Sequence, residues 1–276
     1  MTSVPLIRRL SVLVPTAFLA VFFLAPMVYV LWLSFMDPKP GLANYARFFQ
    51  SGYMVETLLR TVLMAGVVTV VSAFMAYPVA FIIANSPSAY ARALAMVVMS
   101  SFLVSFLVRT FAWLVILGNG GPAQSILALM GWNPPPRLLY TTMASVIAMT
   151  QLLTPLMVLV LYATMRRIDP RLMLASASLG ANNLRSLLNV HLPLSLPGLA
   201  NGGVLIFITC MGYYVTPAIL GSPRDLMISG LIGKQMEQML SFGTAAASSV
   251  ILTSFTGVLF LIYGSFTSLD RLWSAK

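Results

Sequence analysis

The stretch L-M-L-A-S-A-S-L-G-A-N-N-L-R-S-L-L-N-V-H-L-P-L-S-L-P-G, residues 172–198, separates two long apolar runs of the chain. It holds serines, asparagines, an arginine, two prolines and the one histidine of the sequence, His191. The runs on either side, 140–165 and 203–220, carry no charged residue. A polar segment interrupted by glycine and proline therefore belongs outside lipid, and its role decides how the rest of the chain is interpreted.

The composition indicates an integral membrane protein. Of the 276 residues 59% are hydrophobic and 8% charged, with a mean hydropathy of +0.92, whereas a soluble domain carries about 25% charged residues. A net charge of +10 would suggest nucleic acid in a soluble protein. Here the basic residues lie mostly in short loops, which is typical of topology signals and of contacts with anionic lipid. A nucleic-acid partner is not expected.

Six apolar runs are long enough, or nearly so, to cross a bilayer, because a core of about 30 Å needs about 20 helical residues. The alternating pattern of a membrane barrel is missing, and helices satisfy their own backbone hydrogen bonds in lipid. We predict an all-α, multi-pass membrane protein with one transmembrane domain over 1–276 and a retained first helix rather than a cleaved signal peptide. The predicted spans are 10–35, 61–84, 93–117, 140–165, 203–220 and 245–266.

The basic residues favour one orientation mildly. Bases are enriched on the cytoplasmic side of membranes, and a cytoplasmic N-terminus with six spans puts both termini and residues 170–198 on that side. The bases that support this orientation include Arg8, Arg9, Arg166, Arg167, Arg271 and Lys276.

Two short helices are expected within 170–198. Pro170 suits a first helical turn, and Gly180 is placed to end that helix. Three leucines and His191 then recur at helical spacing, and Pro193 and Pro197 are expected to stop or bend this second helix. Because the first helix is too short to be stable alone, we expect it to dock against a partner.

This segment resembles the cytoplasmic loop of permease subunits of bacterial ABC importers. The family's pattern is roughly Glu-Ala-Ala, three residues, Gly, and later Leu-Pro with a second Pro-Gly. The chain has L-A-S-A-S-L-G-A at 174–181 and V-H-L-P-L-S-L-P-G at 190–198. The resemblance implies an ATPase-coupling role for Leu174, Ala175, Ser176, Gly180, Ala181, Pro193 and Pro197.

One position departs from the family's pattern, since Leu174 stands where the family has glutamate. Any salt bridge made there is lost, and docking is expected to rely on apolar fit. A diverged member, a weak pairing offset by a second permease, and an inactive variant are all open explanations.

Three further stretches resemble the spermidine/putrescine branch of these permeases: L-V-R-T-F-A-W at 107–113, G-N-G-G at 118–121 and Y-Y-V-T-P-A-I-L-G at 213–221. The resemblance implies a six-helix, type I importer-like permease of the bacterial inner membrane. Its partners would be a second permease, more a related chain than a copy, an ABC ATPase dimer, a periplasmic substrate-binding protein and membrane lipid. The chain itself would hold no cofactor, because the ATPase subunits bind the ATP.

Polar and aromatic side chains in the third, fourth and fifth runs are candidates for a translocation pathway. A charge at bilayer depth costs about 2.5–3.5 kcal/mol on insertion scales, so an arginine there should face a cavity or a partner group. For each candidate a structural role, as snorkelling charge or as a contact between helices, competes with a pathway role. The candidates are Arg109, Trp113, Gln151, Tyr213, Tyr214 and Thr216.

The predicted spans contain no Asp or Glu. A polycation on a buried path would usually meet a carboxylate or an aromatic face, so this counts against a simple polyamine assignment. Arg109 would instead suit a substrate that bears a carboxylate.

The sequence indicates neither a catalytic nor a metal site. One cysteine, Cys210, and one histidine cannot form a metal cluster, and G-L-I-G-K-Q at 230–235 lacks residues that a phosphate loop requires. Residues 226–240 are expected to form an amphipathic surface helix. Gly198 and Gly202 form a GxxxG pattern, which predicts close helix packing.

Two other functions are open. An ion-coupled secondary transporter would want an inverted repeat and intramembrane acids, and the sequence has neither. A non-transporting membrane scaffold would not need the 170–198 segment.

Overall fold

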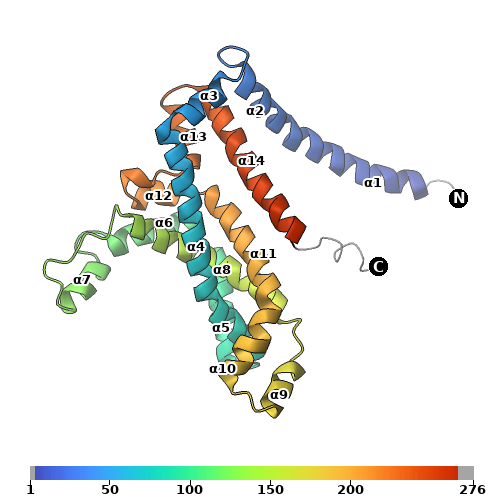
Figure 1. Cartoon of the computed structure of the whole chain (residues 1–276), viewed down its shortest axis with the longest axis vertical. Coiled ribbons are helices and arrows are strands. Elements are labelled where there is room, and N and C mark those ends of the chain that lie inside the picture. The colour runs from blue at the N-terminus through green and yellow to red at the C-terminus, as the bar shows by residue number, and fades with distance from the viewer. Residues whose placement is uncertain (1–3, 267–276) are drawn as a thin grey trace. The chain divides into compact units, whose positions relative to one another are not determined.

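The computed structural model describes residues 4–266, and every regular element in that range is a helix (Figure 1). Six stretches of the described chain are long and apolar enough to cross a membrane, as predicted. They are Leu13–Met36, Gly52–Asn85, Phe106–Leu129, Thr142–Met165, Asn183–Met211 and Phe242–Ser265. The contacts divide the chain into two compact units, Met1–Glu56 with Leu231–Gly257 and Thr57–Gly230 with Val258–Lys276. We describe each by itself; the single domain over 1–276 stays a prediction.

The first unit is held by buried polar groups. It contains α1 (Val4–Leu19), the π-helical turn η1 (Ala20–Leu24), α2 (Ala25–Met36), α3 (Ala43–Gln50) and most of α14 (Phe242–Phe266). The backbone N–H of Gly243 donates to Asp37 Oδ2 at 2.6 Å. Buried Asn44 donates to the Ser34 carbonyl at 3.1 Å and accepts from Thr244 Oγ1 at 3.3 Å. These bonds fix the loop after α2 to the start of α14.

The second unit is built on α4 (Gly52–Asn85), α8 (Thr142–Met165) and α11 (Leu192–Met211) (Figure 1). Small or slender residues recur every three or four positions along the buried face of α4, as a helix packed on one face requires. Those residues are Thr61, Ala65, Val68, Ser72, Ala76 and Ala80. Helix α8 starts at the Thr141 cap, whose Oγ1 accepts from the Ala144 N–H at 3.2 Å. Narrow side chains therefore let these helices approach closely.

The predicted GxxxG packing is confirmed. Gly198 and Gly202 are buried where α11 meets α8. A Cβ added at Gly198 would lie 2.6 Å from Thr164 Cβ, and one at Gly202 would overlap the Met157 side chain. Because a glycine has only a hydrogen as its side chain, α11 and α8 can touch at these two positions.

The third predicted span, 93–117, is not one helix. Helix α5 (Ala89–Leu103) ends at the extended residue Val104, and α6 (Phe106–Leu117) starts anew. The break lacks Gly and Pro, so sequence gave no signal for it. Arg109 donates to Ser101 Oγ across the break at 3.2 Å. Arg109 thus lies in the first turn of α6 and not in mid-span as predicted.

The fifth predicted span, 203–220, starts later in the chain than the stretch Asn183–Met211 that the structure shows. The helices α10 (Asn183–Ser186), η2 (Leu187–His191) and α11 follow without interruption, and a break at 212–214 precedes α12 (Val215–Leu220). The expectation that Pro193 and Pro197 stop the helix is wrong, because α11 runs through both. The π turn η2 ends two residues before Pro193, just as η1 ends two residues before Pro26. A wider turn relieves the clash between a proline ring and the preceding turn.

Helix α13 (Ile228–Glu237) forms within the stretch predicted to be an amphipathic surface helix, and it has one exposed face, with Lys234, Met236 and Glu237, and one buried face. Ile228, Leu231 and Gln235 are buried. Ser248 Oγ donates to Gln235 Oε1 at 3.1 Å. One face of α13 is therefore buried, and its Gln235 side chain meets α14 through Ser248.

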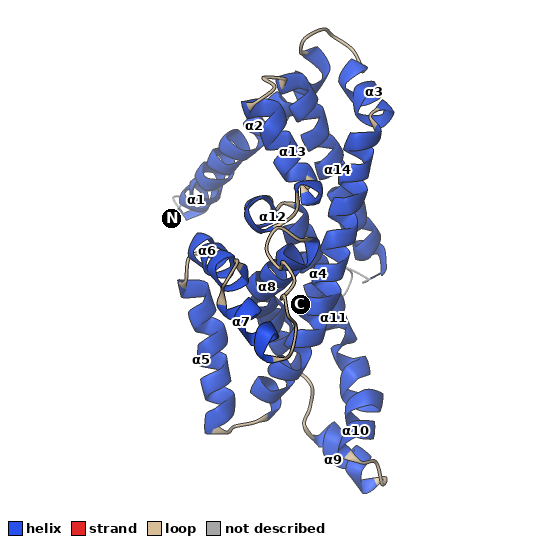
Figure 2. Cartoon of the chain, turned by 90° about the vertical axis from the view of Figure 1, so that its left-hand side faces the viewer, coloured by secondary structure: helices blue, strands red, loops and turns tan. Residues whose placement is uncertain are grey.

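The orientation in the membrane stays a prediction. Arg271 and Lys276 lie outside the described residues, and the side chains of Arg8 and Arg9 lie outside the description too. Within the second unit, α9 (Arg171–Ser178) and α10 lie at one end and α12 lies toward the other in both views (Figures 1 and 2). The end with α9 is therefore the cytoplasmic end under the predicted orientation.

The helix contact at Gly198 can be tested against a glycine on the same helix. Gly198→Ala should lower the midpoint of thermal unfolding in detergent, because overpacking costs about 1–3 kcal/mol. Gly203→Ala should leave it unchanged or raise it, since its Cβ would meet Thr69 Cγ2 at 3.7 Å and alanine favours a helix by up to about 1 kcal/mol. Equal midpoints for the two variants would contradict the packing described.

Candidate functional site

The first helix of the coupling segment, residues 170–198, is closed by a glycine corner. Gly180 has φ +84°, a left-handed conformation that glycine adopts without steric cost. Its N–H donates to the Ala177 carbonyl at 2.9 Å, and the Ala181 N–H donates to the Ser176 carbonyl at 3.1 Å. This pair of bonds is the Schellman arrangement, so the predicted role of Gly180 in ending α9 is confirmed.

The segment is braced internally. Asn182 Oδ1 caps α10 by accepting from the Arg185 N–H at 2.8 Å, and Ser176 Oγ donates to Ser186 Oγ at 2.6 Å. The second bond ties α9 to α10 across the corner. The two short helices therefore form one ordered hairpin at the end of the second unit (Figure 2).

The outer surface of this hairpin exposes leucines beside basic and amide side chains such as Arg171, Arg185 and Asn183. Leu174, at the position where the resemblance expects glutamate, is 69% exposed, and Leu179 beside the corner is 90% exposed. Leu184 on α10 is exposed as well. The predicted coupling residues Ala175, Pro193 and Pro197 are also exposed, whereas Ser176 and Ala181 are half-buried. The hairpin thus offers leucines, rather than a carboxylate, to a partner.

His191 joins the hairpin to α4. Its ring is fully buried, and both nitrogens are bonded. Asn85 Nδ2, at the end of α4, contacts His191 Nε2 at 3.3 Å, and Nδ1 contacts Tyr77 Oη at 3.2 Å. The ring also packs edge-on against Phe81, with centroids 4.7 Å apart. Sequence reasoning treated His191 as a packing or surface residue, and the structure makes it the packed centre of a polar contact.

The directions of these bonds define the state of the ring. An amide nitrogen can only donate, so Nε2 of His191 accepts from Asn85 and the proton of a neutral ring lies on Nδ1. Nδ1–H then donates to Tyr77 Oη, whose hydroxyl donates to Ser195 Oγ at 3.0 Å. Ser195 in turn donates to the Leu192 carbonyl at 3.0 Å. The chain of bonds runs from α4 through η2 into α11 and is complete only with neutral histidine.

The pathway candidates form pairs between helices rather than one site. Trp113 Nε1 donates to Gln151 Oε1 at 3.4 Å, and buried Thr216 Oγ1 lies 3.2 Å from Thr110 Oγ1. These pairs join α6 to α8 and α6 to α12. The structure therefore favours the structural interpretation for Trp113, Gln151 and Thr216.

Three candidates keep accessible or incompletely bonded groups. Tyr214 is exposed, and Tyr213 lies with it beside a cavity of about 210 Å³ that Phe106 also lines. Arg109 donates through Nη1 to Ser101, while its buried Nε has no hydrogen-bond partner in the structure. These groups lie in or next to the breaks at 104–105 and 212–214, where the backbone is not helical.

Sequence reasoning missed Asp225, in η3 (Pro223–Asp225), because it lies outside the predicted spans. It is nevertheless buried, with 5% of its surface exposed. Oδ1 accepts from Thr142 Oγ1 at 2.7 Å, and Oδ2 accepts from the Ser222 N–H at 2.7 Å. A Ser-Pro-x-Asp capping box at 222–225 was the available signal for this carboxylate.

The bonding of His191 can be tested by removing it. His191→Leu should lower the unfolding midpoint in detergent, since leaving buried polar partners unbonded costs about 1–3 kcal/mol. Asn189→Leu changes an exposed residue of the same π turn and should alter stability by less than about 0.5 kcal/mol. If both variants unfold at the wild-type temperature, His191 does not hold α4 to η2.

Comparisons with known proteins agree with this geometry. The family model "Binding-protein-dependent transport system inner membrane component" matches residues 76–269. The spermidine/putrescine transport system permease protein PotB of Haemophilus influenzae is 28% identical over 265 residues, covering 93% of this chain and 92% of the relative. The permease protein YdcU of Escherichia coli strain K12 is 27% identical over 264 residues, covering 88% and 84%.

Two solved structures share the fold. A bacterial ABC transporter that imports the acidic polysaccharide alginate has a TM-score of 0.80 at 18% identity, with 93% of both chains covered. The MetNI methionine ABC transporter in an inward-facing conformation has a TM-score of 0.53 at 20% identity, covering 78% of this chain and 97% of the other. The family model spans most of the sequence, and the chain therefore belongs to the binding-protein-dependent transport system inner membrane components: it is a multi-pass ABC importer permease of the inner membrane and not an enzyme.

Proposed function

We propose that the chain is one of two permease subunits of an ATP-driven importer for a small amino compound of the polyamine kind. The observation that carries this proposal is the ordered hairpin of α9 and α10, which presents exposed leucines at one end of the second unit. The substrate class rests on the relatives named for spermidine and putrescine transport. A periplasmic binding protein would deliver the substrate, and an ATPase dimer would supply the ATP chemistry.

Force would pass from the ATPase to the membrane through the coupling segment. The hairpin docks by its exposed leucines, with Leu174 and Leu179 filling hydrophobic space on the ATPase. The Ser176–Ser186 bond ties α9 to α10, and movement of α10 reaches α11 without a break because α10, η2 and α11 form one continuous helical stretch. The His191 bonds then carry the movement to α4. Leu174 thus makes docking less dependent on salt than a carboxylate would.

The pathway would lie between this chain and a second permease. Tyr213 and Tyr214 offer aromatic faces in a non-helical break, and such faces attract ammonium groups. Arg109 lies on α6, whose first residue, Phe106, lines the same cavity as the two tyrosines, and Arg109 would orient them. Membership of an importer family argues against both alternatives, the ion-coupled secondary transporter and the non-transporting scaffold.

The proposal is tested by reconstitution of the chain with its second permease, ATPase and binding protein in proteoliposomes. Uptake of radiolabelled putrescine or spermidine should require ATP and the binding protein. Uptake driven by an ion gradient without ATP, or ATP-driven uptake of a different class of compound only, would contradict it.

The corner at Gly180 gives a sharper prediction. A left-handed conformation costs a non-glycine residue about 1–2 kcal/mol, and asparagine tolerates it best. Gly180→Val should therefore lower binding-protein-stimulated ATPase activity by about fivefold or more, whereas Gly180→Asn should stay near wild type. Loss of stimulation in both variants, or in neither, would show that the corner does not set the coupling geometry.

A further inference from the structure

We propose that Asp225 and the cavity beside it form a subsite for an alkylammonium group of the transported substrate. This inference rests on the proposed function and deepens it, because it names a carboxylate that the apolar spans lack. It assigns Asp225 a binding role besides its place in the capping box at 222–225.

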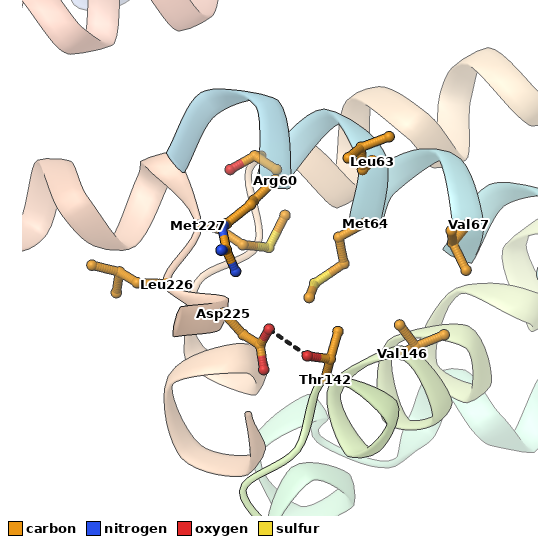
Figure 3. A pocket seen from close by; sticks show the side chains of 10 residues that line it. Arg60, Leu63, Met64, Val67, Thr142, Val146, Asp225, Leu226 and Met227 are labelled. Carbon is orange, nitrogen blue, oxygen red and sulfur yellow. Dashed lines mark hydrogen bonds between the residues drawn. The ribbon is translucent and has the colours of Figure 1, made fainter. Parts of the chain in front are cut away.

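The cavity has a volume of about 300 Å³ and lies among residues 60–67 of α4, the first turns of α8 and the segment at 225–227 (Figure 3). This volume is at the lower end of the range for small-molecule sites. Figure 3 shows the carboxylate of Asp225 and the thioether of Met64 pointing into the same space, with Val67 and Val146 farther along it. Methionine side chains adapt to slender aliphatic ligands. One acid at the end of an apolar channel of this kind suits an ammonium group on a methylene chain.

Among the residues that the structure describes, no charged group donates a hydrogen bond to the carboxylate of Asp225. Both donors, the Thr142 hydroxyl and the Ser222 N–H, are neutral. A carboxylate has about four acceptor sites, and the two bonds occupy one site on each oxygen. Each oxygen can therefore accept a further bond from an ammonium group, and charge-assisted bonds of this type are about twice as strong as neutral ones.

The position of the acid argues for function over capping alone. Asp225 is the N3 residue of the capping box, a position that neutral glutamine also fills, so the box does not require a charge. A buried carboxylate is costly unless it is paired, and Asp225 is 5% exposed although it lies outside the six apolar stretches. Leu63 and Val67 at the rim are exposed, so the cavity opens onto the surface of the second unit.

Arg60 also lines the cavity, and its charge determines which ligand fits. Its side chain is exposed, and Nη1 donates to the Arg224 carbonyl at 3.5 Å. Exposed charges are screened by water and salt, whereas the field of buried Asp225 acts within the cavity. The subsite is therefore selective for cations, and Arg60 weakens it rather than supplying a contact for a substrate carboxylate.

The test uses the complete reconstituted importer and the KM for putrescine uptake. Asp225→Asn should raise KM about tenfold or more, the loss expected for a charge-assisted hydrogen bond. Glu237→Gln removes an exposed carboxylate that does not line the cavity, so it should change KM by less than about twofold. Arg60→Gln should lower KM or leave it unchanged. A raised KM for Arg60→Gln would overturn the cation-selective assignment.

A second variant keeps the inference falsifiable if Asp225→Asn does not assemble. Val67→Lys places a tethered ammonium group at the exposed rim and should block putrescine uptake, while Leu59→Lys, at an exposed residue of α4 that does not line the cavity, should transport normally. Normal KM in both Asp225→Asn and Val67→Lys overturns the subsite. Loss of the second permease from purified Asp225→Asn complexes, with normal uptake by Val67→Lys, also overturns it in favour of a contact between subunits.

These outcomes separate the subsite from the proposed function. A wild-type importer that takes up no amine defeats the proposed function itself. A wild-type importer that takes up putrescine, with unchanged KM in the variants, defeats only the role of Asp225.

Discussion

The continuity of the helix from Asn183 to Met211 is the constraint on which the rest of the structure depends. Its 29 residues span about 43 Å at 1.5 Å per residue, from the exposed hairpin into the buried contact with α8. Two prolines within it would ordinarily break a helix. The π turn at Leu187–His191 absorbs the first of them, and the same turn brings His191 under α4. The π turn therefore keeps the helix continuous and also places His191 where it bonds to Asn85 and Tyr77 of α4.

The polar chemistry of the chain gathers where helices break. Arg109 lies beside the break at 104–105, the two tyrosines lie at 212–214, and Asp225 lies in the connection after α12. Some polar groups inside the helices instead pair across helix contacts, Thr110 with Thr216 and Trp113 with Gln151. A transporter needs polar groups that a substrate can reach, and non-helical backbone is tolerated at membrane depth where it lines a cavity.

Sequence reasoning predicted the features that periodicity and composition encode. The six apolar stretches, the glycine corner at Gly180 and the tight contact at Gly198 each follow from a local rule. The interruption after Leu103 did not, because neither Gly nor Pro marks it, and the Arg109–Ser101 bond that spans it joins side chains eight residues apart. The late placement of the fifth span came from treating Pro193 as a stop, which neglects the π turn. Asp225 was missed because a carboxylate between two spans looks like a loop residue until tertiary packing buries it.

The most direct test of the account is a cysteine cross-link between the hairpin and the ATPase. Cys210 is the one cysteine of the sequence, so a Cys210→Ser background with Leu174→Cys gives a single thiol on the exposed surface of α9. In the assembled importer we predict that this thiol cross-links to a cysteine on the ATPase surface and reacts with impermeant reagents only from the cytoplasmic side. Labelling from the periplasmic side, or an assembled complex in which the thiol never reaches the ATPase, would contradict the account.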